Sequence, residues 1–157
     1  MWNKNSLCDI LVWYKNKGIV VMKNLVFMSI KQIHIDRILS KLKNHEFRTK
    51  KPKQKIKYIA VYVPSPLKEL KYILKVREPI STPDKILIDG YGNQSFNKES
   101  KEKYAYPIEN VYEINKQITL KDLREKFNFT APQSFAYGER YPELIDYIEK
   151  IGFTKLY

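Results

Sequence analysis

Residues 41–53 read KLKNHEFRTKKPK, a basic segment in which Glu46 is the only acid. A run of this kind is usually a solvated surface or a disordered tail. The pattern that follows Lys43, however, alternates like a half-buried strand, with Glu46 and Arg48 on one face and Phe47 on the other. We therefore expect Phe47 to point into a core, while the acid and the arginine point together, close to Lys43.

Hydrophobic periodicity divides the rest of the chain into short elements. The predicted strands cover 25–30, 57–63, 71–77, 85–88, 104–114 and 133–138, and the predicted helices cover 32–42, 119–127 and 142–152. Pro107 is expected to break the strand that contains it, and Thr119 to cap the second helix. Pro142 and Gly152 mark the two ends of the last helix. Glycine, proline, asparagine and serine predict a loop-like region over 79–103.

The order of these elements predicts the fold class. Short strands outnumber helices and there is no doubly wound βαβ alternation, so we expect an α+β fold, a small mixed β-barrel with helices packed around it. At 157 residues the chain fits one domain with a substantial core. Residues 1–21 differ from the rest, and two interpretations stay open: an N-terminal extension before a domain over 22–157, or an extra strand at a sheet edge.

The charge of the chain indicates an anionic partner. Lysine and arginine outnumber the acids by 29 to 17, giving a formal net charge of +12, which favours nucleic acid or another polyanion. One cysteine and two histidines are too few for a Cys/His zinc site or an intramolecular disulfide. No apolar run approaches the ~20 residues that span a bilayer, and no signal-peptide pattern opens the chain. We therefore expect a cytoplasmic protein without a metal, a cofactor or a membrane partner.

Lys43, Glu46 and Arg48 are the most informative polar group. The arginine fork suits phosphate or the acceptor edge of a base, and a carboxylate accepts from the exocyclic amine of cytosine or guanine. A site with both could read a base and hold its phosphate. The competing interpretation is an exposed Glu46–Arg48 pair, which would contribute only ~0–1 kcal/mol.

Further candidates come from the start of the first helix, the segment APQSFAY (131–137) and the basic run after Arg48. The additional ligand-binding candidates are Lys31, Gln133, Ser134 and Tyr137. The candidates for steering RNA by charge are Lys50, Lys51, Lys53 and Lys55. A helix start collects anions, although a solvated lysine is the simpler explanation of Lys31. The basic run would attract phosphate in a salt-dependent way, or it would only protect a sheet edge from pairing.

The order of these motifs resembles the ASCH domain of the PUA-like superfamily. The resemblance rests on SIK (29–31), IDRILS (35–40), KNHEFR (43–48), YIAVYVPSP (58–66) and APQSFAY (131–137), and it spans residues 25–137. In the family signature Gly-x-Lys-x-x-Glu-x-Arg, Lys43, Glu46 and Arg48 match, whereas Lys41 stands at the glycine position. The resemblance implies a PUA-like barrel whose cleft binds RNA or a nucleotide.

The resemblance leaves the chemistry of that cleft open. Some relatives are amidohydrolases that deacetylate N4-acetylcytidine, and ribonuclease activity has been described in others. In the amidohydrolase branch a threonine follows the lysine by three residues, where this chain has Glu46. The alternative to a binding module is a small hydrolase acting on a modified nucleoside or RNA, with Lys43 partly desolvated and Glu46 as general base. A scaffold that uses its basic face on an acidic protein or a membrane is a third interpretation.

Overall fold

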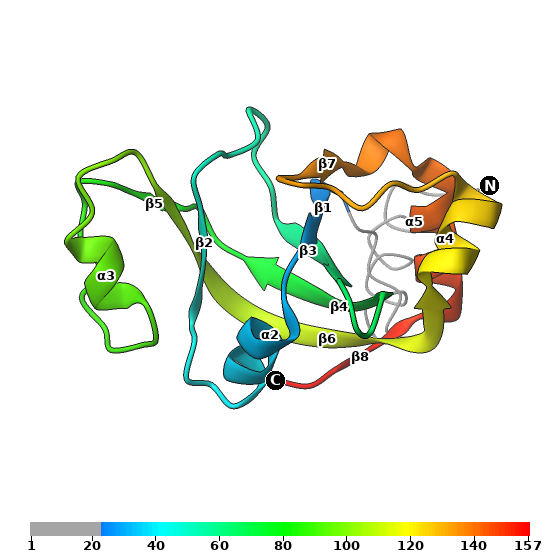
Figure 1. Cartoon of the computed structure of the whole chain (residues 1–157), viewed down its shortest axis with the longest axis horizontal. Helices are drawn as coiled ribbons and strands as arrows, with labels where there is room; N and C mark the ends of the chain where they lie inside the picture. Colours follow the sequence, from blue (N-terminus) through cyan, green and yellow to red (C-terminus); the bar gives the residue numbers. More distant parts are fainter. Residues whose placement is uncertain (1–22) are drawn as a thin grey trace, which may run out of the picture.

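In residues 23–157, the part of the chain that the computed structural model describes, eight strands form one curled sheet and four α-helices pack around it (Figure 1). The strands are β1 (Leu25–Ser29), β2 (His45–Arg48), β3 (Tyr58–Val63), β4 (Glu69–Val76), β5 (Ile80–Ser81), β6 (Tyr104–Thr119), β7 (Ala136–Tyr137) and β8 (Phe153–Lys155). The helices are α2 (Gln32–Leu39), α3 (Asn93–Asn97), α4 (Leu120–Phe127) and α5 (Pro142–Ile151), and η1 (Gly138–Arg140) is a 3-10 turn. The predicted extension over 1–21 lies outside the described residues.

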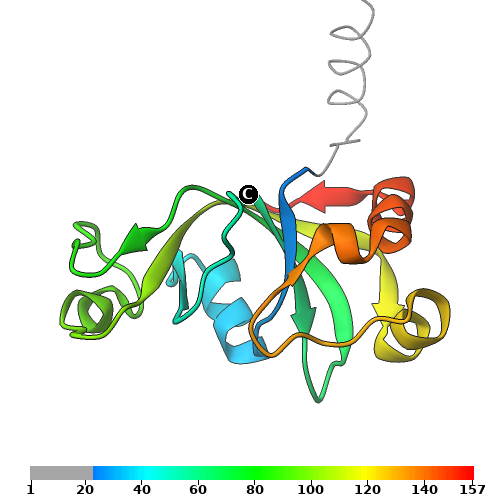
Figure 2. The same ribbon diagram turned by 90° about the horizontal axis from the view of Figure 1, so that it is seen from above.

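Strand β6 organises the sheet. Its 16 residues pair with β2, β5, β4 and β8, all antiparallel. The path through the sheet runs β2-β6-β4-β3-β1-β7, in which β1 and β3 are parallel. Register shifts interrupt the β3–β4 and β4–β6 pairings, and such irregularities increase the local twist. The sheet therefore curls into a half-barrel, seen from above in Figure 2, and the prediction of an α+β fold with helices around a curled mixed sheet is confirmed.

Pro107 does not break β6, contrary to the prediction. It lies inside the strand, opposite His45 of β2. Its position is where β6 changes neighbours, because β4 ends its pairing at Ile108 and β5 begins its pairing at Ala105. The proline carbonyl accepts from the Arg77 amide at 3.0 Å. No residue of β4 or β5 is paired with Pro107, so a residue that cannot donate from its backbone nitrogen is tolerated there.

Helices cover both faces of the sheet, which explains why β1 is apolar on both sides. Phe27 is fully buried in a core that it shares with Leu144 of α5. Met28, the next residue, is fully buried in a second core that it shares with Ile35 of α2. A strand enclosed in this way reads as a continuous apolar run rather than an alternating one.

The predicted ends of the helices are largely confirmed. The Thr119 hydroxyl accepts from the Asp122 amide at 3.2 Å and so caps α4. Helix α5 begins at Pro142 and stops at Gly152, whose φ of +77° suits a residue without a side chain. Helix α2 ends at Leu39, earlier than the predicted 42. The predicted strand 133–138 shortens to β7, and β8 was not predicted.

The region 79–103 is more structured than the sequence suggested. No strand forms over 85–88, which was predicted to contain one. The side chain of Asn97 takes the place of a strand partner: its oxygen accepts from the Ile86 amide at 2.7 Å, and its nitrogen donates to the Ile86 carbonyl at 2.8 Å. The same region contains β5 and the short helix α3, which begins after Gly92 at a φ of +86°.

Candidate functional site

Lys43, Glu46 and Arg48 come together at β2. Oε1 of Glu46 lies 3.1 Å from Nη2 of Arg48, and Oε2 lies 3.7 Å from Nζ of Lys43. The three side chains are 8%, 14% and 4% exposed, in the order Glu46, Arg48, Lys43. The group is therefore buried, and the competing interpretation of an exposed surface pair is wrong.

Strand alternation arranges this group as the sequence predicted. Glu46 and Arg48 share one face of β2, and Phe47 packs on the other side against Phe96, with ring centroids 5.8 Å apart. The ammonium of Lys43 contacts residues of both faces of β2, because Nζ lies near Glu46 and also 4.3 Å from the centre of the Phe47 ring. The aromatic residue thus anchors the strand and also contacts the buried cation.

Two segments far away in the sequence hold the arginine. Nη2 of Arg48 donates to the Ser29 carbonyl at 3.0 Å, at the end of β1. Nη1 donates to the Ser134 carbonyl at 3.5 Å, and the Ser29 hydroxyl donates to the Pro132 carbonyl at 2.8 Å. The site is thus built where β1, β2 and the segment before β7 meet.

The buried group keeps spare hydrogen-bonding capacity. Oε2 of Glu46 and Nε of Arg48 are buried without a hydrogen-bond partner among residues 23–157. Buried polar atoms in folded proteins are nearly always paired, with protein, water or ligand. With two cations and one anion, the group also has a formal excess of one positive charge. An acceptor for the guanidinium and a donor for the carboxylate would complete the site.

Burial changes the proton affinity of two groups at this site. It lowers the pKa of Lys43, and the neighbouring carboxylate of Glu46 only partly opposes that shift. Burial also lowers the pKa of the His34 imidazole, and the positive charge of Lys43 lowers it further. The carboxylate of Glu46 acts in the opposite direction on His34. No pattern in the sequence singled this histidine out.

Lys41, at the glycine position of the signature, has a backbone conformation that favours glycine. Its φ is +65°, in the left-handed region, where a side chain collides with the backbone. This residue turns the chain out of α2 and into the segment that leads to β2. The departure from the signature therefore keeps the turn and adds strain to it.

Tyr91, from the region predicted as a loop, lies at the edge of the site. The guanidinium carbon of Arg37 lies 3.8 Å from the centre of the tyrosine ring, and the His34 ring centroid lies 6.4 Å from it. The Tyr91 amide donates to the Leu42 carbonyl at 2.8 Å. Pattern analysis missed this residue, because nothing local indicates that 90–92 folds back onto α2.

The remaining candidates lie around the site with fewer contacts. Lys31 and Gln133 are exposed, Lys31 immediately before α2 and Gln133 just before Ser134. Ser134 contributes its carbonyl to Arg48, whereas the Tyr137 hydroxyl accepts from the Lys53 amide at 3.0 Å. The steering candidates Lys50, Lys51, Lys53 and Lys55 are all exposed.

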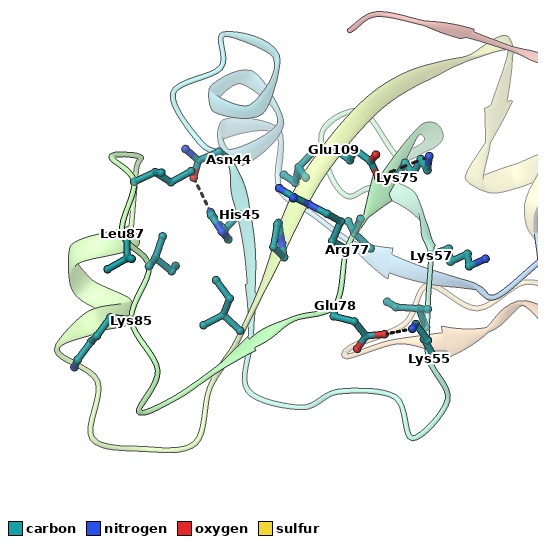
Figure 3. Close-up of a pocket in the computed structure, with 17 residues that line it drawn as sticks. Asn44, His45, Lys55, Lys57, Lys75, Arg77, Glu78, Lys85, Leu87 and Glu109 are labelled. Carbon is teal, nitrogen blue, oxygen red and sulfur yellow. Dashed lines mark hydrogen bonds and ion pairs between the residues drawn. The ribbon is translucent and has the colours of Figure 1, made fainter.

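A separate basic cleft of about 880 Å³ opens elsewhere on the sheet (Figure 3). His45 contributes to its lining, but Glu46 and Arg48, which follow it on β2, do not. Of the five cations that line this cleft, Lys55 pairs with Glu78 at 3.1 Å and Lys75 pairs with Glu109 at 3.7 Å. Apart from these charged side chains and the imidazole of His45, which is only 3% exposed, the lining is mostly aliphatic and contains no Phe, Tyr or Trp ring. It offers charge for an approaching polyanion but no exposed aromatic surface on which a base could stack.

Within residues 23–157, no cluster of three or more His, Cys, Asp or Glu side chains is arranged to hold a metal ion. In the same part of the chain, no helix has the length and apolar character that crossing a bilayer requires.

Comparison with known proteins identifies the fold. No protein-family model matches the sequence, and no curated protein matches it. Among solved structures, the ASCH protein of Zymomonas mobilis superimposes with a TM-score of 0.59 at 18% identity, covering 78% of this chain and 94% of that one. Its Ser-to-Ala variant superimposes with a TM-score of 0.58 at 19% identity, covering 82% of this chain and 99% of that one. Its Tyr-to-Phe variant superimposes with a TM-score of 0.59 at 18% identity, covering 79% of this chain and 98% of that one. At such identities the likeness establishes the fold alone, and on that ground the resemblance is confirmed: the chain has the α+β fold of these ASCH structures.

Proposed function

We propose that the protein is an RNA- or nucleotide-binding domain that holds its ligand at Lys43, Glu46 and Arg48. The observation that carries this proposal is the buried, incompletely paired cluster of two cations and one acid. Lys43 and Arg48 would take phosphate or the acceptor edge of a base, and Glu46 would accept from a base amino group. Lys31, Gln133, Ser134 and Tyr137 are proposed to line the same site.

The electrostatics of the charged cluster supports a binding site for an anionic ligand over a cluster with a purely structural role. Removing charges from water is expensive, and an unequal cluster of buried charges is stable only when further groups compensate it. A phosphate would supply one negative charge next to the excess cation and acceptors for the free Nε of Arg48. A base amine would donate to Oε2 of Glu46, which accepts no hydrogen bond within residues 23–157. A nucleotide carries both groups.

The exposed lysines of the 50–55 segment would increase the rate at which RNA arrives. They follow Arg48 in the sequence and add exposed positive charge, and each phosphate contact that they make should weaken as salt increases. Such contacts position a nucleic acid without reading its bases. The cluster and the lysines should therefore differ in how strongly single substitutions change affinity.

Fluorescence anisotropy with a short single-stranded RNA tests the proposal. Binding would be measured at about 50 and 200 mM salt for the wild type, Glu46→Gln, Arg48→Ala and Arg48→Lys, with Lys55→Ala as the control. We expect the three cluster variants to weaken binding at least tenfold, and Lys55→Ala to weaken it by less than about threefold. Arg48→Lys keeps the charge and loses the bidentate fork. Equal effects of Arg48→Ala and Lys55→Ala would show that only bulk charge matters.

A second candidate function is hydrolysis of a modified nucleoside or of RNA. It is favoured by the lowered pKa of Lys43 together with Oε2 of Glu46, which lies 3.7 Å from Nζ of Lys43 and has no hydrogen-bond partner among residues 23–157. In that mechanism Glu46 would take a proton from a water molecule, and Lys43 would orient the water or stabilise the developing negative charge. Both roles need groups that are close together and shielded from solvent.

Turnover assays separate the two candidates. Acylated cytidines and RNA oligonucleotides would be incubated with the wild type and with Glu46→Gln, and the products separated by chromatography. Hydrolysis that Glu46→Gln abolishes, in a variant that remains folded by circular dichroism, would establish an enzyme. Binding without turnover over a broad panel of nucleosides would favour the binding domain over the hydrolase.

A further inference from the structure

Tyr91 is an aromatic side chain that the fold brings to the edge of the charged cluster. Its ring lies against the guanidinium of Arg37 and near the imidazole of His34. The Tyr91 amide donates to the Leu42 carbonyl at 2.8 Å, and the Lys43 amide donates to the carbonyl of Arg37 at 3.0 Å. These contacts connect the tyrosine to the segment that carries Lys43, the first residue of the proposed ligand site.

The backbone around Tyr91 is fastened to the start of β2. Nδ2 of Asn44 donates to the Asp89 carbonyl at 2.7 Å, and Nδ2 of Asn93 donates to Oδ1 of Asn44 at 3.0 Å. Figure 3 shows Asn44 on the side of β2 toward the loop that carries Leu87. The segment 89–93 is consequently bound to the strand that carries Glu46 and Arg48.

The glycines on either side of Tyr91 allow this close approach. A Cβ atom on Gly90 would lie 2.6 Å from the side chain of Asn44, and a Cβ atom on Gly92 would lie 2.7 Å from the Phe47 ring. Atoms at those distances overlap, so a side chain at Gly90 would displace the hydrogen-bonded amide of Asn44, and one at Gly92 would displace the packed ring of Phe47. The segment that carries Tyr91 is therefore packed against the start of β2 rather than a detached surface loop.

The tyrosine ring nevertheless remains open to ligand. It is 46% exposed even though Arg37 and His34 contact it. An exposed aromatic ring beside a cationic site is the usual platform on which single-stranded bases stack. The aliphatic cleft described above lacks such a ring, so stacking favours the Tyr91 side of β2.

We propose that Tyr91, supported by Arg37, is a stacking subsite for a nucleobase. The inference rests on the proposed function and makes it more specific: the ligand carries a planar base as well as an anionic group. Stacking needs the aromatic ring and not its hydroxyl, so phenylalanine should replace tyrosine and alanine should not. The base can belong to RNA or to a free nucleotide, and the experiment below separates these two sources.

The direct test compares two oligomers of equal length and charge. One is a labelled single-stranded RNA, and the other is an abasic sugar–phosphate oligomer. We expect Tyr91→Ala to lower the affinity for RNA by between about fivefold and a hundredfold and to leave the affinity for the abasic oligomer unchanged. Tyr91→Phe should stay within about twofold of the wild type. Competition by nucleoside monophosphates, with ribose 5-phosphate as reference, shows whether free nucleotides occupy the same subsite.

Two controls make the result decisive. Tyr147 packs against Phe127 on the helices α5 and α4, at the far end of the molecule from α2 (Figure 1), so Tyr147→Ala should not change base discrimination. Arg48→Ala tests the charged cluster itself. If Arg48→Ala weakens RNA binding and Tyr91→Ala does not, the stacking subsite is wrong and the proposed function stands. Equal losses for RNA and the abasic oligomer in Tyr91→Ala, or no binding by the wild type, would also overturn the subsite.

Discussion

Arg48 lies 3.1 Å from Glu46, the same distance that separates Lys55 from Glu78. The surroundings of the two ion pairs differ. The side chains of Glu46 and Arg48 are 8% and 14% exposed, whereas those of Glu78 and Lys55 are 62% and 69% exposed. Two ion pairs with the same N–O distance in one protein therefore differ strongly in burial.

We predict that Glu46→Gln destabilises the fold far more than Glu78→Gln. Loss of Glu46 leaves Lys43 and Arg48 as buried cations without an anion, which costs roughly 3–5 kcal/mol. Loss of Glu78 removes a solvated pair that contributes about 0–1 kcal/mol. Thermal unfolding followed by circular dichroism should show Tm lower by roughly 6–20 °C for Glu46→Gln. Equal shifts of Tm in the two variants would mean that Glu46 does not compensate the buried charges of Lys43 and Arg48.

Local patterns were enough to predict the strand that carries the cluster. The alternation of Glu46, Phe47 and Arg48 follows from strand geometry alone, and it gave the correct face for each side chain. The signals for the two ends of α5 are also local, because Pro142 and Gly152 have conformations that suit the first and last positions of a helix. Features of this kind need only a few neighbouring residues.

Long-range contacts explain what the sequence did not reveal. The Asn97 side chain replaces a strand partner for Ile86, and no pattern within 85–88 encodes that. Pro107 is accommodated because β6 changes neighbours there, which depends on strands distant in the sequence. Tyr91 reaches the site only through contacts with α2 and β2. Each of these features is a property of the assembled fold.

We predict that Lys41→Gly stabilises the protein. Lys41 has a φ of +65°, a conformation that costs a non-glycine residue about 1–2 kcal/mol. Glycine removes that strain but adds about 0.5–1 kcal/mol of chain entropy to be lost on folding, so a net gain of about 0.5–1 kcal/mol is expected. Lys71→Gly is the matched control, because Lys71 lies within the regular strand β4 and glycine should destabilise it. Urea unfolding measures both, and a loss of stability in Lys41→Gly would contradict the prediction.

Gly92→Ala should be more damaging than Gly152→Ala. Both glycines have positive φ values, +86° and +77°, so alanine strains both backbones to a similar extent. The added methyl differs in what it meets: the ring of Phe47 at 2.7 Å for Gly92, and the amide end of the Asn115 side chain at 3.0 Å for Gly152. A packed ring yields less than a side-chain tip, so we expect an additional loss of about 1–3 kcal/mol at Gly92.

The same pair of glycine variants reports on the Tyr91 subsite. Gly92→Ala should displace Tyr91 and reduce RNA affinity in the anisotropy assay, whereas Gly152→Ala should leave it unchanged. Urea unfolding gives the stability of each variant, and binding would be measured under conditions in which both are fully folded. Equal stability losses would show that the Phe47 contact is not restrictive.

His45 should make stability fall as the solution becomes acidic. Burial, reinforced by the charges of Lys43 and Arg77, lowers the pKa of His45 from 6.5 to about 4. Its Nδ1 lies 2.6 Å from Oδ1 of Asn44, which suits a neutral ring that donates one hydrogen bond. Between pH 6.5 and 4 the unfolded chain binds a proton that the folded chain does not, so unfolding is favoured as the pH falls.

The size of this effect follows from the difference between the two pKa values. The free energy of unfolding should drop by about 3 kcal/mol between pH 7 and pH 4 through His45 alone. Carboxyl groups titrate in the same window, so the measurement is the difference between wild type and His45→Gln, each unfolded in urea at several pH values. The variant should lose this part of the pH dependence and keep the rest. NMR titration gives the pKa of His45 directly, and a value near 6.5, or the same pH dependence in His45→Gln, would contradict the prediction.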